Sequence, residues 1–180
     1  NSGIPADEAR QLNIELLPMP FFIDGKVYYE GVDLSAPEFY EAQASGCNIT
    51  TSQPSPGDVT ALWDRLLQDH DAVVHIPMSS GLSNSCATAQ MLAMEYGGRV
   101  QVADVRRISM TQRQAALDAL RLIERGLDPV QVRVRLEETA LRSSIYVTPD
   151  TLVYLKKGGR ITPAAAAIGS VLNIKPVLQI

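Results

Sequence analysis

Between residues 71 and 150, apolar stretches of strand length alternate with stretches of helix length. Strands are expected at "DAVVHIPM", "RVQVADV" and "SIYVTPD", and helices at residues 84–96, 111–125 and 128–142. This alternation is typical of βαβ units, whose parallel strands are covered by helices on both faces. The sequence therefore predicts an α/β fold: a three-layer α/β/α domain with a mostly parallel sheet.

The region before residue 71 has a different pattern. Residues 14–23 are apolar and are expected to form a buried strand, and Asp24-Gly25 separates them from "KVYY" at 26–29, which predicts a β-hairpin. Ser35 begins a capping-box pattern, so a helix should follow it. This N-terminal part is expected to belong to the same domain as the alternating region.

The last part of the chain has a different residue pattern. A basic, glycine-containing turn, "KKGGRI", lies between two helical pieces, and an apolar strand follows, within which the chain stops at Ile180. We therefore expect an N-terminal α/β domain at residues 1–146. Residues 147–180 are expected to be the beginning of a C-terminal α/β domain that is incomplete here.

Composition excludes several classes of protein. A net charge of −4 argues against a nucleic-acid partner, and no apolar run approaches the length of a membrane span. The start does not resemble a signal peptide, and Cys47 and Cys86 form no C-x-x-C motif, so no metal site or cofactor is predicted. A cytoplasmic protein is expected.

The segment "HIPMSSGLSNSCATAQ" contains a candidate nucleophile. Ser83 lies in a sequence that is one residue short of the G-x-S-x-G elbow of serine hydrolases. A serine-dependent esterase or thioesterase that uses Ser83 is therefore one alternative. It is weakened because an elbow serine needs a histidine base later in the chain, whereas the two histidines here, His70 and His75, both precede Ser83.

A second alternative is an anion site without catalysis. Hydroxyl side chains at a strand-to-helix junction offer O–H donors beside the free N–H groups of the helix. A second hydroxyl cluster, "ITTSQPSPGD", also precedes a helix. Simple N-capping explains each cluster equally well, and the two can converge only if both loops open at the same edge of the sheet. Nucleotide binding is disfavoured, because the glycine-rich phosphate-binding motifs are absent.

Several separated motifs occur together in the order of a known family. They are "TTSQPSPGD", "SSGLSNS" with "TAQMLA" after it, "VADVRRISM", and "TPDTLVYLKKGGRI" with "AIGSVLNIKPVLQI" after it. In this order the chain resembles the DegV family of fatty-acid-binding proteins. The resemblance extends from "PMPFFIDGKVYYEGVDLS" to Ile180.

This resemblance implies a bacterial protein of two α/β domains that binds one long-chain fatty acid, such as palmitate, stearate or oleate, between them. It implies no enzymatic activity and no catalytic residue. A separate fatty acid kinase would phosphorylate the bound acid. Carried over by motif, Thr51, Ser52, Ser83 and Asn84 would hold the carboxylate, and Arg160 would face the kinase or lie near the domain junction.

The sequence departs from the family pattern at several places, and the Asp-Ser usual near the beginning is absent, since the chain opens at Asn1-Ser2. The serine loop usually reads L-S-G-T, but here it is Leu82-Ser83-Asn84-Ser85, which adds a side chain at the entrance to the site. Residues 111–114 are polar where the family usually has small, apolar residues. If this helix start lines the tunnel for the acyl chain, the change affects which fatty acid, or which chain length, the protein prefers. The C-terminal region from which the family supplies a histidine to the carboxylate is not in this sequence.

Overall fold

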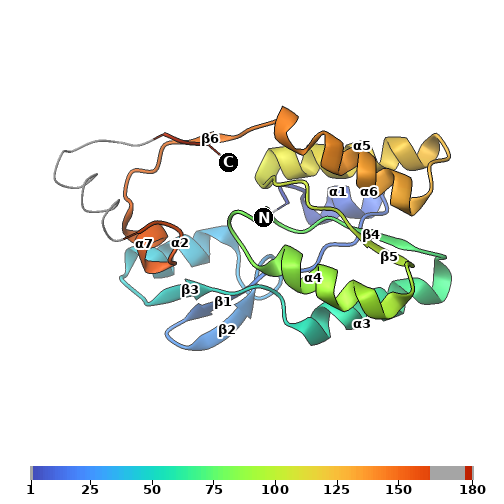
Figure 1. Ribbon diagram of the computed structural model, residues 1–180. Coiled ribbons are helices and arrows are strands. Elements are labelled where there is room, and N and C mark those ends of the chain that lie inside the picture. Colours follow the sequence, from blue (N-terminus) through green and yellow to red (C-terminus); the bar gives the residue numbers. More distant parts are fainter. Residues whose placement is uncertain (1, 163–176, 180) are drawn as a thin grey trace. The chain divides into compact units, whose positions relative to one another are not determined.

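The computed structural model describes residues 2–162 and 177–179 of the 180 (Figure 1). It divides into two compact units, Asn1–Ser143 and Ser144–Ile180. The first unit contains the serine and threonine loops of interest. The second contains Arg160.

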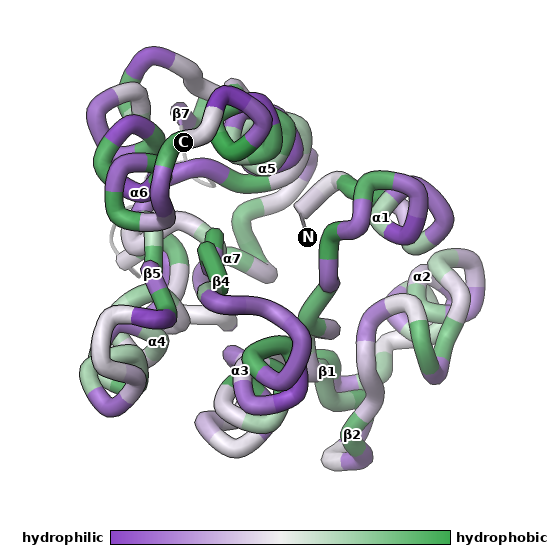
Figure 2. The backbone as a smooth tube through the Cα atoms, turned by 90° about the vertical axis from the view of Figure 1, so that its right-hand side faces the viewer, coloured by the Kyte–Doolittle hydropathy of each residue, from purple (hydrophilic) through white to green (hydrophobic). Residues whose placement is uncertain are grey.

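A parallel sheet lies at the centre of the first unit. Strand β4 (Val73–His75) pairs in parallel with β5 (Val100–Val102), with Val73 opposite Val100. Helices α3 (Pro56–Asp69) and α4 (Ser85–Ala93) cover one face, and α5 (Ser109–Glu124) and α6 (Pro129–Glu138) cover the other (Figures 1 and 2). The predicted three-layer α/β/α arrangement is confirmed.

Each face of this sheet has its own apolar core, because side chains alternate along a strand. Beneath α3 and α4 the buried residues are Val59, Trp63, Cys86, Ala89, Val100 and Val102. Beneath α5 and α6 they are Ala103, Val105, Ala115, Ala119, Val132 and Leu136. Both cores lie entirely within the first unit.

A second sheet precedes this core in the chain. Strands β1 (Pro20–Ile23), β2 (Lys26–Tyr29) and β3 (Ile49–Thr51) pair antiparallel in the order β2-β1-β3. The predicted hairpin is confirmed, with Asp24 and Gly25 at φ of 50° and 85° in its turn. The strand expected at 14–23 begins only at Pro20, a residue type that a strand accepts at its first position, and Pro18 before it has no N–H to donate to a ladder.

Local sequence signals set the helix starts. Helix α1 spans Ala6–Gln11 and α2 spans Ala36–Ala44. The predicted capping box is present: Glu38 N–H donates to Ser35 Oγ, and Ser35 N–H donates to the Glu38 carboxylate. Two 3₁₀ turns, η1 (Met94–Tyr96) and η2 (Ala140–Arg142), follow α4 and α6.

The second unit contains β6 (Tyr146–Val147) and β7 (Leu178–Gln179), which pair antiparallel, and the short helix α7 (Val153–Lys157). The helical piece expected after "KKGGRI" falls on residues 163–176, which lie outside the described part. The unit boundary falls at Ser143, and the assignment of 147–180 to a C-terminal domain stays a prediction. No helix in the described ranges is long and apolar enough to cross a membrane.

Candidate functional site

The serine loop, residues 79–85, follows β4 at its carboxyl end. Ser79 begins it and is only 4% exposed. Its N–H donates to the Arg107 carbonyl at 3.0 Å, and its own carbonyl accepts from the N–H groups of Leu82 and Ser83 at 3.0 and 3.1 Å. The loop is therefore a closed turn that is fixed at Ser79 to the segment following β5.

Ser83 and Asn84 stand at the start of α4. Ser83 Oγ accepts from the N–H of Ser85, the first residue of the helix, at 3.1 Å. The capping alternative placed Ser83 at the N-cap, but that position is held by Asn84, whose side chain makes no capping bond. Because the Ser83 oxygen already accepts one bond, its O–H is the group available to donate to a ligand.

Thr51 and Ser52 lie at the end of β3. Thr51 is exposed and pairs with Phe21 across the antiparallel ladder. Ser52 is exposed as well, and its N–H donates to the Pro20 carbonyl at 3.1 Å. Three residues later Ser55 caps α3, accepting the Asp58 N–H at 3.1 Å. The threonine loop, residues 51–55, thus runs from a strand end directly into a helix start.

A pair of hydrogen bonds joins the threonine loop to the helix that follows the serine loop. The Gln53 amide of the threonine loop donates to Thr88 Oγ1 at 3.1 Å, and the Thr88 hydroxyl lies 3.3 Å from Gln53 Oε1. Thr88 is one turn beyond Asn84, whose carbonyl accepts the Thr88 N–H. The threonine loop therefore lies against the first turn of α4, just after the serine loop. Within the described residues no hydrogen bond links Thr51 or Ser52 directly to Ser83 or Asn84.

One buried polar side chain from α5 contacts the segment between β4 and the serine loop. Gln112, on α5, is buried and donates to the Ile76 carbonyl at 3.0 Å, three residues before Ser79. Its Oε1 has no partner among the described residues, nor has Ser85 Oγ. Sequence analysis did not identify Gln53 or Arg107 and noted Gln112 only as one of the polar residues at 111–114, because their roles depend on contacts with distant segments.

Neither histidine is placed as a base for Ser83. The Trp63 indole N–H donates to His75 Nδ1 at 3.3 Å, on the α3 side of the sheet. Burial lowers the pKa of His75 to about 4, so the ring is neutral at physiological pH. His70 ends α3 before β4, at the opposite end of that strand from the serine loop.

Arg160 belongs to the second unit and follows α7. Its side chain is exposed and donates to the Gly158 carbonyl at 2.6 Å, and its N–H donates to the Leu155 carbonyl. The guanidinium is thus folded back on its own turn. Its role toward a partner stays a prediction.

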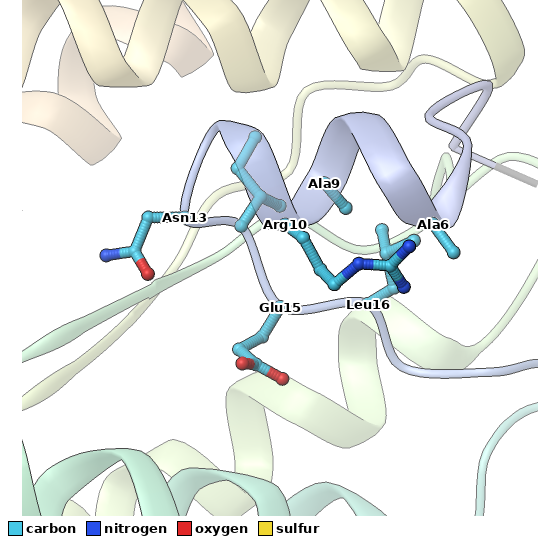
Figure 3. Close-up of a pocket in the computed structure, with 7 residues that line it drawn as sticks. Ala6, Ala9, Arg10, Asn13, Glu15 and Leu16 are labelled. Atoms are coloured by element: carbon cyan, nitrogen blue, oxygen red, sulfur yellow. The ribbon is translucent and has the colours of Figure 1, made fainter.

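A hollow of about 310 Å³ lies beside α1 (Figure 3). It is lined by Ala6, Ala9, Arg10, Asn13, Ile14, Glu15 and Leu16. Glu15 is held in an ion pair with Arg65 at 2.8 Å. None of the predicted site residues lines this hollow, and its charged wall does not suit an acyl chain.

Comparison with known proteins agrees with this architecture. A family model described as "Uncharacterised protein, DegV family" matches residues 1–180, so the chain belongs to the DegV family. A DegV domain-containing protein of Deinococcus radiodurans is 32% identical over 180 residues, covering 99% of this chain and 64% of the relative.

Two solved structures are also similar, each 32% identical and covering 99% of this chain and 64% of the other. One, of a DegV family protein from Thermus thermophilus, is described by its fatty acid binding and has a TM-score of 0.86. The other, DegV of Bacillus subtilis, is described as a fatty acid binding protein and has a TM-score of 0.85. This chain therefore spans a little under two thirds of the relatives that it matches.

Proposed function

We propose that this chain is part of a protein that binds a long-chain fatty acid, with Thr51, Ser52, Ser83 and Asn84 holding the carboxylate. The observation that carries the proposal is the Gln53–Thr88 hydrogen-bond pair, which joins the threonine loop to the first turn of α4, the helix that follows the serine loop. It is supported by two structural relatives, each 32% identical, that are described as binding fatty acids. The two loops offer neutral donors at helix starts, which suit a carboxylate.

The energetics fit a ligand that is held mainly by its tail. At about 0.8 kcal/mol for each buried CH₂, a sixteen-carbon acid gains on the order of 10 kcal/mol before the entropy of binding is subtracted. The carboxylate loses hydration on binding and needs donors in compensation. Hydroxyl groups supply these donors and leave one side of the carboxyl group accessible.

Accessibility of the carboxyl group bears on what happens to the acid next. We propose that the protein is not itself an enzyme and that it presents the acid to a separate, cytoplasmic fatty acid kinase. The esterase alternative is not favoured, since His75 Nδ1 is engaged by Trp63 and His70 lies at the other end of β4. A fluorophosphonate probe tests this point, because labelling at Ser83 would restore the esterase alternative.

The test of the main proposal is lipid binding by the full-length protein. Native mass spectrometry after purification should show an acyl chain, and labelled palmitate should exchange into the site. Ser83→Ala should weaken palmitate binding by roughly tenfold to a hundredfold, the value of one hydrogen bond to a charged group. Ser80→Ala, an exposed hydroxyl of the same loop, is the matched control and should leave affinity unchanged. No bound lipid and no palmitate uptake would refute the proposal.

A further inference from the structure

Arg107 is a buried arginine that the proposed site does not use. It is 4% exposed, and it lies between β5 and α5. Its Nε donates to the Ala140 carbonyl at 3.3 Å, and its Nη2 donates to the Thr139 carbonyl. Both carbonyls lie just beyond the carboxyl end of α6, where the helix dipole favours a cation.

The backbone carbonyl of Arg107 contacts the serine loop. Its carbonyl accepts the Ser79 N–H, the Ser79 carbonyl accepts the Ser83 N–H, and Ser83 Oγ accepts the Ser85 N–H. A continuous series of hydrogen bonds therefore runs from Thr139 and Ala140 through Arg107 to Ser83. Thr139 and Ala140, where this series begins, lie four and three residues before Ser143, at which the first unit ends.

The backbone on both sides of Arg107 has a strained conformation that surrounding contacts must fix. Arg106 and Ser109 both have φ of 51°, in the left-handed region that side-chain-bearing residues rarely adopt. Such residues persist only where surrounding contacts fix them. Burial lowers the pKa of the Arg107 guanidinium and the charge of Asp118 opposes that shift, so the side chain is retained there at a desolvation cost.

We infer that Arg107 is a positioning residue, which ties the placement of Ser79 and Ser83 to the point where the chain leaves the first unit. Gln112 does not duplicate this tie, because it bonds Ile76, upstream of the loop. A shift of the η2 turn would be transmitted to Ser83 through one side chain. This inference rests on the proposed function only in taking Ser83 as a ligand contact.

The direct test is amide hydrogen exchange by NMR in the 180-residue chain without ligand. Arg107→Met keeps the apolar stem and removes both donors, and it should speed exchange at Ser79 and Ser83 by roughly tenfold relative to Trp63, a factor that corresponds to about one of the two hydrogen bonds lost. Arg107→Lys, which cannot form the two-carbonyl fork, should lie between Met and wild type. Arg135→Met, which removes an exposed ion pair on α6, is the control and should change neither amide.

Unchanged exchange at Ser79 and Ser83 in both Arg107 variants would overturn the inference. If Arg107→Met does not fold, Arg107→Lys alone decides, with unchanged protection again counting against it. Palmitate binding by the full-length protein separates the two proposals. Absence of binding in wild type would defeat the proposed function and leave the exchange result standing, whereas binding with unaltered exchange would defeat only the role of Arg107.

Discussion

The His75 imidazole shows how the packing of one residue sets its charge. Its ring lies edge-on to Trp63 with centroids 5.4 Å apart, and the indole N–H occupies Nδ1. Burial lowers the pKa of His75 from 6.5 to about 4, because the imidazolium loses hydration. Protonation at Nδ1 would also break the bond from Trp63, since that nitrogen would become a donor.

This lowered pKa makes stability depend on pH. His75 of the unfolded chain takes up a proton below about pH 6.5, but His75 of the folded chain does so only near pH 4. The stability that neutral His75 contributes is therefore complete above about pH 6.5 and is lost as the pH falls toward 4. Between pH 7.5 and 5 the free energy of unfolding should fall by about 2 kcal/mol from His75 alone. Urea unfolding of wild type and His75→Gln at both pH values measures this. His70→Gln is the control and should keep the full decrease, and equal pH slopes for wild type and His75→Gln would contradict the prediction.

At the scale of elements, sequence analysis located helix starts better than strand lengths. The pairs Ser35 with Glu38 and Ser55 with Asp58 are local, so four residues of sequence contain the whole capping signal. Strand length depends on the partner. Residues 71–78 were predicted as one strand, but β4 pairs with β5 only at 73–75, because the chain then turns toward the contacts made by Gln112 and Arg107.

A close approach between the N-terminal segment and α5 gives a prediction at this scale. Gly3 has φ of 70°, and a Cβ there would lie 2.9 Å from the Ser109 carbonyl carbon. Gly97, at the end of η1, has φ of 59° and open space around it. Gly97→Ala should cost about 1 kcal/mol for its backbone conformation alone. Gly3→Ala should cost at least about 1 kcal/mol more, because backbone atoms must move. Thermal unfolding measures the loss of stability in both variants. Equal losses would contradict the prediction, because they would show that the backbone at Ser109 moves away from the new Cβ without cost.

At the scale of the whole molecule, the alternation of strands and helices was enough to predict the three layers. It could not predict that the threonine loop contacts α4. The Gln53–Thr88 bonds connect residues 35 apart in sequence, and they exist because α3 and α4 pack on the same face of the sheet. The four predicted carboxylate residues were taken from motifs, and their role in binding stays a prediction.

The position of the two cores leads to a prediction about the first unit alone. Every buried residue of both cores lies before residue 144. A fragment of residues 1–143 should therefore fold on its own and melt cooperatively, within about 2 °C of the 180-residue chain. Circular dichroism on heating measures this. A fragment that melts without cooperativity would show that Ser144–Ile180 contributes to the core.

The Trp63 side chain also has an optical consequence. It is the only tryptophan in the chain, it is 0% exposed, and its ring packs between His75 and Tyr96 at 5.4 and 5.3 Å. Indole emission from this 180-residue chain therefore comes from a single fluorophore in the first unit, beneath the strand that leads into the serine loop. Its emission spectrum reports that layer of the structure without any added label.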